Sequence, residues 1–217
     1  MKKIGILGTG IVGTTIGTKL IGLDYEVMIG SRTASNEKSL SWVDKNGSSA
    51  SAGTFEEAAD FGEIIFNCTR GDAALEIFKQ AGLNKFDNKT VIDISNPLDF
   101  SKGMPPTLIP EYVNTNSLAE EIQKLLPEAN VVKTLNIVNC DVMVDPGLSN
   151  GEPTMFICGN NNDAKEEAKI FLYQFGWQDI LDLGDIKNAR AMEMILPLWV
   201  RTYGVTGNAH FAFRVVR

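Results

Sequence analysis

Short apolar runs alternate with amphipathic stretches up to about residue 135, and this alternation constrains the fold of the chain more than any other feature. The apolar runs have the length of strands and span Lys3–Gly8, Glu26–Ile29, Ser49–Gly53, Ile64–Cys68, Thr90–Ile94 and Val131–Leu135. The stretches between them have helical spacing and span Ile11–Ile21, Glu37–Lys45, Phe55–Phe61, Ala73–Ala81 and Leu118–Leu126. Strands that alternate with helices form a mainly parallel sheet covered on both faces, so we expect a doubly wound α/β fold.

The rhythm changes after about residue 145. We expect a smaller α/β part there, with elements at Thr154–Gly159, Ala164–Phe175, Gln178–Leu183 and Ile186–Tyr203. The last of these is a long helix, and Pro197 inside it should kink the axis because proline lacks a backbone N–H. The chain is therefore predicted to have a main domain over 1–145 and a small C-terminal part over 146–217. Between strands, Pro97–Asn116 is expected to be a structured loop or partial lid.

A glycine-rich loop joins the first predicted strand to the first predicted helix. Gly8-Thr9-Gly10-Ile11-Val12-Gly13 fits the pattern G-x-G-x-x-G in the context that a dinucleotide-binding loop requires. Gly8 would allow the tight turn, Gly10 would let the backbone approach a pyrophosphate, and Gly13 would let the helix pack closely on the strand. The phosphates would then lie at the N-terminus of the helix. Glycines that serve only tight packing are the alternative. The loop predicts a Rossmann-type fold with residues 1–145 as its nucleotide-binding domain.

The end of the second predicted strand separates two classes of dinucleotide site. A site selective for NAD carries Asp or Glu about 20 residues after the glycine loop, where it bonds the ribose 2′-hydroxyl. This chain has Gly30-Ser31-Arg32 there. The Arg32 guanidinium can bond a 2′-phosphate in a fork, with Ser31 and Thr9 as further donors. The sequence therefore predicts NADP, in the form NADPH, as the cofactor; a solvated loop arginine is the alternative for Arg32.

Uncharged hydrogen-bonding residues follow three later strands. They are Cys68 and Thr69 after the fourth strand, Ser95, Asn96 and Pro97 after the fifth, and Asn136 after the sixth. The carboxyl ends of parallel strands line one crevice, so we expect these residues to surround the nicotinamide. Two alternatives stay open: Ser95 and Asn96 could simply form the turn before Pro97, and Cys68 could be a buried strand residue.

Groups suited to acid–base catalysis are scarce. The single histidine, His210, lies near the C-terminus among aromatic residues, and the pairs Asp93 with Asp99 and Asp182 with Asp185 lie in or beside turns. Neither these residues nor the three separated cysteines have the spacing of a metal site, so no metal and no catalytic side chain is predicted. Hydride transfer fits this shortage, because the cofactor carries the chemistry and the protein supplies alignment.

Charge and cysteine usage limit the partners. The net charge is −7, from 20 Lys and Arg against 27 Asp and Glu, and such a chain repels nucleic-acid backbones. Residues 1–32 and 190–217 are basic around an acidic middle, so the C-terminal end should either fold back toward that middle or face an anionic acceptor. Sparse cysteines without a secretory signal or a membrane span predict a cytoplasmic protein.

Five motifs together carry a family resemblance. They are Gly8-x-Gly10-x-x-Gly13, Gly30-Ser31-Arg32, Asp93-Ile-Ser95-Asn96-Pro97, Cys158-Gly159-Asn160-Asn161-Asn162-Asp163 and Leu183-Gly184-Asp185-Ile-Lys-Asn-Ala189-Arg190-Ala-Met-Glu193. With them the chain resembles the NADPH-dependent reductases of coenzyme F-420 over essentially its whole length, in particular bacterial dinucleotide-binding oxidoreductases. It is also similar to the cytosolic reductase domain of six-transmembrane metalloreductases.

The resemblance implies a site and a reaction. Thr9, Ser31 and Arg32 would take the 2′-phosphate, segments ending at Thr69, Asn96 and Asn136 would surround the nicotinamide, and the acceptor would enter between the two parts of the chain. The implied function is hydride transfer between NADP(H) and a planar acceptor of the deazaflavin (coenzyme F-420) or flavin type. Arg70 and the loop Phe100–Pro110 match nothing in the family pattern, so a quinoid or small carbonyl acceptor stays open.

Two other functions are considered. Reduction of a small imine or carbonyl compound would need a proton donor in the cleft, for which Lys133 and Lys187 are the nearest candidates. A non-catalytic NADP(H)-binding sensor would expose an apolar C-terminal helix and lack an acceptor pocket.

The C-terminal helix offers further expectations. Arg190 and Glu193 lie three residues apart and could pair with each other; otherwise Arg190 would anchor the helix to the first domain or to a second subunit. The large apolar residues of this region are expected in the core or at a homodimer interface rather than around a substrate. They are Met192, Met194, Trp199, Tyr203, Phe211 and Phe213.

Overall fold

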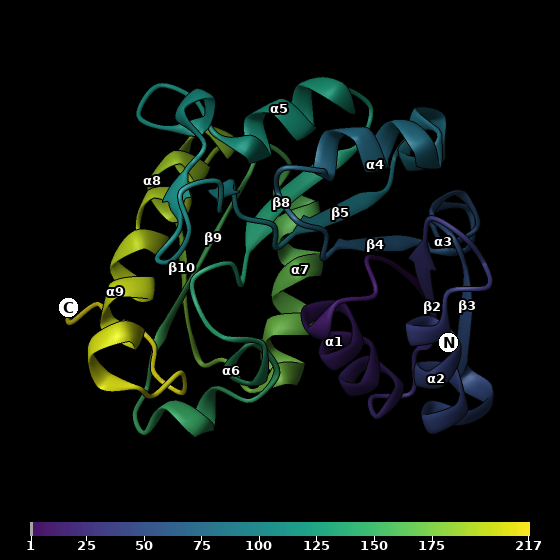
Figure 1. Ribbon diagram of the computed structural model, residues 1–217, viewed down its shortest axis with the longest axis horizontal. Helices are drawn as coiled ribbons and strands as arrows, with labels where there is room; N and C mark the ends of the chain where they lie inside the picture. The colour runs from purple at the N-terminus through teal and green to yellow at the C-terminus, as the bar shows by residue number, and fades with distance from the viewer. Residues whose placement is uncertain (1) are drawn as a thin grey trace.

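The computed structural model describes residues 2–217, and its centre is a sheet of eight strands (Figure 1). These strands are β1 Lys3–Leu7, β2 Glu26–Ser31, β3 Ala50–Thr54, β4 Ile64–Asn67, β5 Thr90–Asp93, β8 Asn130–Thr134, β9 Thr154–Gly159 and β10 Asp179–Asp182. Their order is β10-β9-β8-β5-β4-β1-β2-β3, and the β8–β9 pair is antiparallel while the other neighbours are parallel. The prediction of a doubly wound, mainly parallel sheet is confirmed.

Helices cover both faces of the sheet. One face carries α1 Ile11–Ile21, α2 Glu37–Asn46, α6 Cys140–Val144 and α7 Asn162–Phe175; the other carries α3 Phe55–Phe61, α4 Ala74–Ala81 and α5 Leu118–Leu125. Figure 1 shows α4 and α5 above the sheet and α1, α6 and α7 below it. Side chains alternate between the faces, so Ile4 and Ile6 enter one core and Leu7 enters the other.

Local signals set several helix ends where the sequence placed them. Thr54 accepts a hydrogen bond from the Glu57 N–H at 3.2 Å, and the Glu57 carboxylate accepts one from the Thr54 N–H at 2.7 Å. This is a capping box, which satisfies two N–H groups that the first turn of α3 would leave unpaired. Short 3₁₀ segments add to the connections at Gly47–Ser49, Leu83–Phe86, Pro110–Tyr112, Pro146–Ser149 and Ile186–Asn188.

The strand order reverses beside β1. The chain proceeds from β1 through β2 to β3 in one direction and then returns to place β4 on the other side of β1. Connections leave the carboxyl ends of β1 and β4 in opposite directions, which opens a crevice between them. A Cβ added to Gly8, just after β1, would come within 2.8 Å of the Cys68 carbonyl oxygen, just after β4. The glycine loop therefore lies at this switch point.

The predicted long C-terminal helix is interrupted. It consists of α8 Ala189–Met194 and α9 Leu196–Thr206, separated at Ile195. Pro197 lies in the first turn of α9, where a residue without an N–H leaves no helical hydrogen bond unmade. Instead of one helix with a kinked axis, the chain therefore forms two successive helices, and Pro197 lies at the start of the second.

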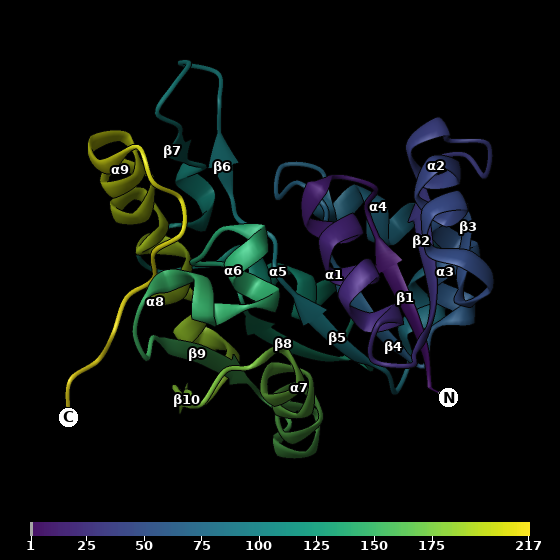
Figure 2. The same cartoon turned by 90° about the horizontal axis from the view of Figure 1, so that it is seen from below.

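The loop after β5 has structure of its own. Strands β6 Leu98–Asp99 and β7 Thr107–Leu108 form an antiparallel pair that stands out from the sheet beside α9 (Figure 2). The Asn114 N–H contacts the sulfur of Met194 at 3.3 Å, which joins the end of this loop to α8. The prediction of a structured loop is confirmed.

The basic C-terminal end folds back onto the acidic middle of the chain. The Thr154 N–H donates to the Phe213 carbonyl at 3.0 Å. Arg214 pairs with Glu152 at 3.2 Å and Arg217 with Asp179 at 2.6 Å. The first of the two explanations offered for the basic end therefore holds for these two arginines. Strand β1 and the C-terminal end lie on opposite sides of the molecule (Figures 1 and 2).

Candidate functional site

The glycine loop leaves the start of α1 open. The Gly8 N–H donates to the Gly30 carbonyl at 3.0 Å, and Gly8 has a φ of 113°, which favours glycine. No side chain caps α1 at Gly10, and its first turn contains no acidic residue. The first N–H groups of a helix need partners, and here the positive end of the helix dipole has no anion from the described chain. Such an end binds anions.

Positions 10 and 13 of the G-x-G-x-x-G motif differ in whether the fold itself requires glycine. A Cβ at Gly13 would lie 2.2 Å from the Gly8 carbonyl oxygen, so close packing of α1 on the loop excludes any side chain there. A Cβ at Gly10 would meet no atom within 4 Å, and Gly10 has an ordinary φ of −75°. The fold by itself therefore requires glycine at 13 and does not require it at 10.

The end of β2 presents one buried hydroxyl and one exposed cation. The Ser31 Oγ donates to the Thr33 carbonyl at 2.6 Å, so its single hydrogen is already used within the turn. Arg32 is exposed, and no carboxylate among residues 2–217 pairs with it. This guanidinium is available to an anion that approaches from solvent, whereas Ser31 can act toward such an anion only by releasing Thr33.

A buried polar network lies under the ends of β4 and β5. The Asn67 amide donates to Asp93 Oδ1 at 2.7 Å, and its carbonyl oxygen accepts from the Thr69 hydroxyl at 2.7 Å. Asp93 Oδ1 also accepts from the Ser95 N–H at 3.1 Å and from the Ser95 hydroxyl at 2.7 Å. These bonds fix the turns after both strands.

A buried charge cluster extends this network to the C-terminal part of the chain. The Lys133 ammonium lies 2.8 Å from Asp93 Oδ2 and 3.1 Å from Glu193 Oε1, and it also donates to the Ser95 carbonyl. All three charged side chains are fully buried. Burial by itself lowers the pKa of Lys133, but the charges of Asp93 and Glu193 outweigh it and hold that pKa above its ordinary value. Lys133 therefore stays charged.

Glu193 and Arg190 dock α8 onto the first turn of α5. The Glu193 carboxylate accepts from the N–H groups of Leu118 at 2.8 Å and Ala119 at 3.1 Å. Arg190 forms two hydrogen bonds with the Glu120 carboxylate, at 2.8 and 2.6 Å. The expectation that Arg190 and Glu193 pair with each other is wrong, because each finds a partner on α5. Arg190 instead anchors its helix to α5, within the first 145 residues, as the alternative expected.

Asn96 and Asn136 form a reciprocal pair. The Asn136 amide donates to Asn96 Oδ1 at 2.9 Å and to the Met192 carbonyl at 2.8 Å, while the Asn96 amide donates to the Asn136 carbonyl at 2.8 Å. The Asn136 side chain is 1% exposed, and its Oδ1 atom has no hydrogen-bond partner among residues 2–217. An unpaired buried acceptor is costly, so this atom points to a donor that the chain does not supply.

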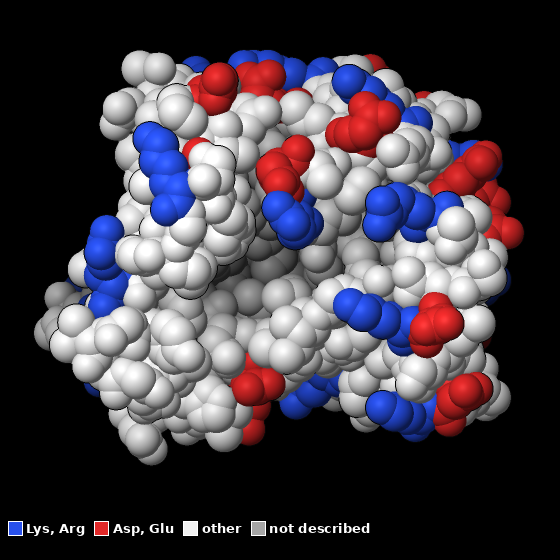
Figure 3. All heavy atoms as spheres, in the orientation of Figure 1, with Lys and Arg blue, Asp and Glu red and all other residues white. Residues whose placement is uncertain are grey.

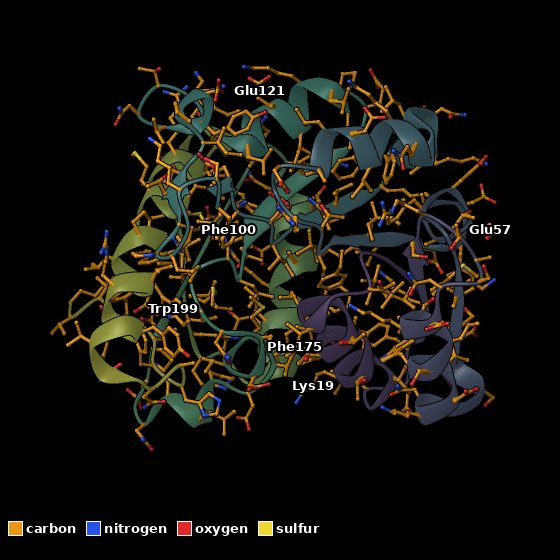
Figure 4. All side chains as sticks on the ribbon, viewed as in Figure 1. Lys19, Glu57, Phe100, Glu121, Phe175 and Trp199 are labelled. Carbon is orange, nitrogen blue, oxygen red and sulfur yellow. The ribbon has the colours of Figure 1, made fainter. Side chains whose placement is uncertain are left out.

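These elements surround one cleft of about 450 Å³. The glycine-loop helix and the strand ends contribute Ile11, Val12, Cys68, Thr69, Ser95, Asn96 and Asn136. The opposite wall, which we call the apolar wall, consists of Leu98, Phe100, Met143, Leu196, Trp199 and Val200. Figure 3 shows uncharged atoms at the bottom of the hollow and charged side chains at its rim, and Figure 4 shows Phe100 and Trp199 on the α9 side of the molecule.

The charged lining residues of the cleft are a single cation and a single anion. Arg70 forms two hydrogen bonds with the Asp72 carboxylate, at 3.1 and 2.5 Å, and its guanidinium lies 5.9 Å from the centre of the Phe100 ring. Cys68 adds no reactive thiolate, because burial raises the pKa of its thiol far above the ordinary value. The lining therefore has no net charge.

Known proteins are similar to this chain in sequence. A family model described as "NADP oxidoreductase coenzyme F420-dependent" matches residues 3–97. The F420-dependent NADP reductase of Methanocaldococcus jannaschii is 26% identical over 206 residues, covering 91% of this chain and 91% of that protein. Metalloreductase STEAP3 of Rattus norvegicus is 29% identical over 206 residues, and the chain spans only 38% of its length.

A solved structure decides the family. A protein of Arthrobacter sp. FB24, named as a proposed F420-dependent NADP reductase, is 43% identical with a TM-score of 0.93, and the match covers 100% of both chains. This chain belongs to the F420-dependent NADP reductase family. It is an NADP-dependent oxidoreductase. The reductive aminase of Aspergillus terreus in complex with NADPH, at 19% identity and a TM-score of 0.66, shares the fold.

The reductase gathers most of the predicted site residues. Ile11, Val12, Cys68, Thr69, Ser95, Asn96 and Asn136 line one cleft; Gly8, Thr9 and Gly10 lie in the loop that leads into α1, and Gly13 lies in the first turn of α1. Ser31 and Arg32, after β2, and Pro97 do not line it. The site roles of all fourteen residues, the predicted domain boundary, the homodimer and the cytoplasmic location stay predictions.

Sequence reasoning missed the charge cluster and the apolar wall of the reductase. A lysine in the middle of an apolar strand was the signal for the cluster, since a fully buried lysine needs buried carboxylates. Trp199, expected in the core or at an interface, lines the cleft instead. His210 lies elsewhere and contacts Asp141 at 3.1 Å. Within residues 2–217, every helix is too short or too polar to cross a membrane.

Proposed function

We propose that the reductase transfers a hydride between NADP(H) and a planar acceptor of the deazaflavin or flavin type. The observation that carries this proposal is Gly10, where the fold leaves room for a side chain beside an uncapped helix end that opens toward the cleft. Glycine at that position is explained by a ligand whose pyrophosphate approaches the backbone closely.

The loop and the end of β2 would hold the phosphates. The free N–H groups at the start of α1 suit the pyrophosphate, with Gly8, Thr9, Gly10, Ile11, Val12 and Gly13 forming the cradle. Arg32 would bind the 2′-phosphate through its fork of donors, supported by Thr9 and, after release from Thr33, by Ser31. A site with a free guanidinium and no carboxylate at the strand end favours NADP over NAD.

The strand ends would hold the nicotinamide. The unpaired Oδ1 of Asn136 suits the amide hydrogens of a carboxamide, and the reciprocal pair with Asn96 keeps that atom in place. Cys68, Thr69, Ser95 and Pro97 would complete the enclosure, held by the network around Asn67 and Asp93. When bound, NADPH supplies a hydride from its nicotinamide C4 and becomes NADP⁺, while the acceptor takes that hydride and a proton from water.

The cleft suits transfer between two rings. Its apolar wall offers a flat, apolar surface to a second ring beside the nicotinamide position, and alignment of two planar rings at about 3–3.5 Å is the main requirement of hydride transfer. Neither lysine considered as a proton donor for an imine lines the cleft, since Lys133 is sealed against Asp93 and Glu193 and Lys187 lies on the surface. Because Lys133 cannot reach a ligand in the cleft, reduction of an imine is disfavoured.

The proposal is tested by turnover without oxygen. The purified protein is mixed with NADPH and, in turn, with F420, FMN, riboflavin, a quinone, an imine and a small ketone, and the loss of NADPH absorbance is followed. We expect saturable oxidation with the deazaflavin or the flavins. Turnover with the imine or the ketone alone would overturn the proposed acceptor class, and tight NADPH binding without any turnover would favour a sensor.

The Gly10→Ala variant tests whether the free space at Gly10 is needed by the cofactor. Because the added methyl meets no protein atom, we expect the free energy of unfolding to change by less than about 0.5 kcal/mol. The affinity for NADPH should fall at least tenfold, roughly 1.4 kcal/mol, in a fluorescence titration. Gly204→Ala is the matched control, since a Cβ there also meets no atom and α9 carries it away from the loop. Equal NADPH affinity in both variants would contradict the assignment.

A further inference from the structure

Two buried side-chain atoms without a hydrogen-bond partner occur among residues 2–217, and both belong to residues of the same cleft. One is Asn136 Oδ1, an acceptor at the strand ends; the other is Trp199 Nε1, a donor in the apolar wall. Native proteins leave few buried polar atoms unpaired, so each one needs an explanation. The proposed function uses the first atom and leaves the second without a role.

The plane of the Trp199 ring is fixed by aromatic neighbours. The rings of Tyr203 and Phe211 lie nearly parallel to it, at interplanar angles of 14° and 13° and centroid distances of 5.9 and 5.1 Å. Trp199 projects from α9 toward the middle of the molecule (Figure 4). These stacks hold the plane of the indole, whose one polar atom, Nε1, is buried without a partner.

The surroundings of Trp199 favour an uncharged ligand group. Its neighbours in the apolar wall are Leu196, Val200, Met143, Leu98 and Phe100. The one cation of the lining, Arg70, is already neutralised by Asp72. An anionic group placed here would lose its hydration without gaining a free cation, which makes its binding unfavourable.

We propose that Trp199 Nε1 donates a hydrogen bond to a ring carbonyl of the hydride acceptor, and that the reductase recognises an uncharged, carbonyl-bearing ring rather than a charged tail. This inference rests on the proposed function and narrows its acceptor to ring systems such as the pyrimidinedione part of a flavin or deazaflavin. An indole N–H donates but cannot accept, so it selects an acceptor atom in the ligand. The tail of such an acceptor then lies outside the cleft.

The first test compares two acceptors that share one ring. Riboflavin and FMN carry the same isoalloxazine, and FMN adds a phosphate to the tail. With the wild-type protein and saturating NADPH, we expect KM values within about threefold of each other and little change between low and high salt. A KM for FMN that is at least tenfold lower and rises with salt would show that the tail charge is recognised, which overturns the proposal.

The second test removes the donor and keeps an aromatic ring. Trp199→Phe should raise the KM for riboflavin about three- to tenfold, the effect of losing one neutral hydrogen bond, while the Kd for NADPH stays within twofold. Tyr203→Phe is the matched control, because it removes a hydroxyl from the same helix and keeps the ring beside Trp199. A parallel loss of NADPH affinity, or no change in the KM for riboflavin, would overturn the role of Nε1.

The two proposals fail in different ways. If no flavin, deazaflavin or quinone oxidises NADPH, the proposed function falls and this inference falls with it. If flavins turn over and either test above gives its contrary result, the proposed function stands and only this inference falls. The comparison of riboflavin with FMN uses unaltered protein, so it decides whether the charged tail is recognised even where Trp199→Phe disturbs the stack of rings.

Discussion

The two walls of the cleft differ in polarity: one rests on hydrogen-bonded polar and charged residues, and the other is apolar. At the strand ends, Asn67, Asp93 and Lys133 are buried, charged or polar, and bonded to one another. In the apolar wall, Leu196 and Val200 offer no polar group, and Trp199 has one that is unused. Apart from Asn136 Oδ1, the polar groups at the strand ends are bonded to one another, and such a wall holds a fixed geometry, which suits a cofactor common to many enzymes. An apolar wall selects by shape and by few contacts, which suits the acceptor.

Glu193 joins the two walls. It lies on α8, just before the helix that carries the apolar wall, and its partners Lys133, Leu118 and Ala119 belong to the strand-end side. The position of Trp199 relative to Asn136 therefore depends on a buried charge as well as on apolar packing. Substitutions in the charge cluster should therefore change the stability of the protein, whereas substitutions in either wall should change the affinity for a ligand.

Lys133→Met should have the largest effect on stability. The substitution keeps the length of the side chain but leaves Asp93 and Glu193 buried without their cation, which costs about 3–5 kcal/mol. Urea denaturation measures this loss. Lys85→Met is the control, because the Lys85–Asp60 pair lies at the surface, where solvent screens an ion pair, and its loss should change stability far less. Similar losses in both variants would show that the cluster does not hold the two walls together.

Arg32→Ala should affect the cofactor alone. Loss of a charge-assisted contact of roughly 1.5–3 kcal/mol would weaken NADPH binding about ten- to a hundredfold and leave NADH binding nearly unchanged. Titration of both dinucleotides measures the contrast. Arg201→Ala, which removes an exposed arginine from α9, serves as the control. An equal loss of affinity for NADPH and NADH would show that Arg32 does not bind the 2′-phosphate.

The Arg190–Glu120 pair should make a smaller contribution to the free energy of unfolding, and that contribution should depend on pH. Burial by itself raises the pKa of Glu120, but hydrogen bonds from Arg190 and Ser117 outweigh it and hold that pKa below its ordinary value. A carboxylate with a lowered pKa stabilises the folded state fully above its unfolded pKa of about 4.3, and the contribution is lost as the pH falls from there through the lower pKa of the folded state. Glu120→Gln should therefore cost about 1 kcal/mol at neutral pH and almost nothing near pH 3.

Urea denaturation at both pH values measures this difference. Glu76→Gln, an exposed carboxylate on α4 without an ion pair among the described residues, provides the control. A cost for Glu120→Gln that is the same at both pH values would mean that packing of the side chain, rather than its charge, docks α8 on α5.

Local patterns predicted the sheet well and the contacts between distant segments poorly. The runs around Ile4, Ile64 and Val91 are apolar for their whole length, which identifies buried parallel strands without reference to any neighbour. The partner of Arg190 could not be read in the same way, since Glu193 at helical spacing competes with Glu120, which lies 70 residues away. Only the docking of α8 on α5 decides between them.

The sequence alone determined the α/β fold, the glycine loop and the position of a cation after β2, because each depends on residues close together in the chain. Tertiary structure alone decided that Lys133 meets Glu193, that Gly13 is glycine for packing while Gly10 is not, and that Trp199 lines a cleft while its buried N–H has no partner. The physical reason is that burial, charge pairing and unfilled hydrogen bonds depend on what surrounds a side chain in space, and periodicity reveals only which side of an element it occupies.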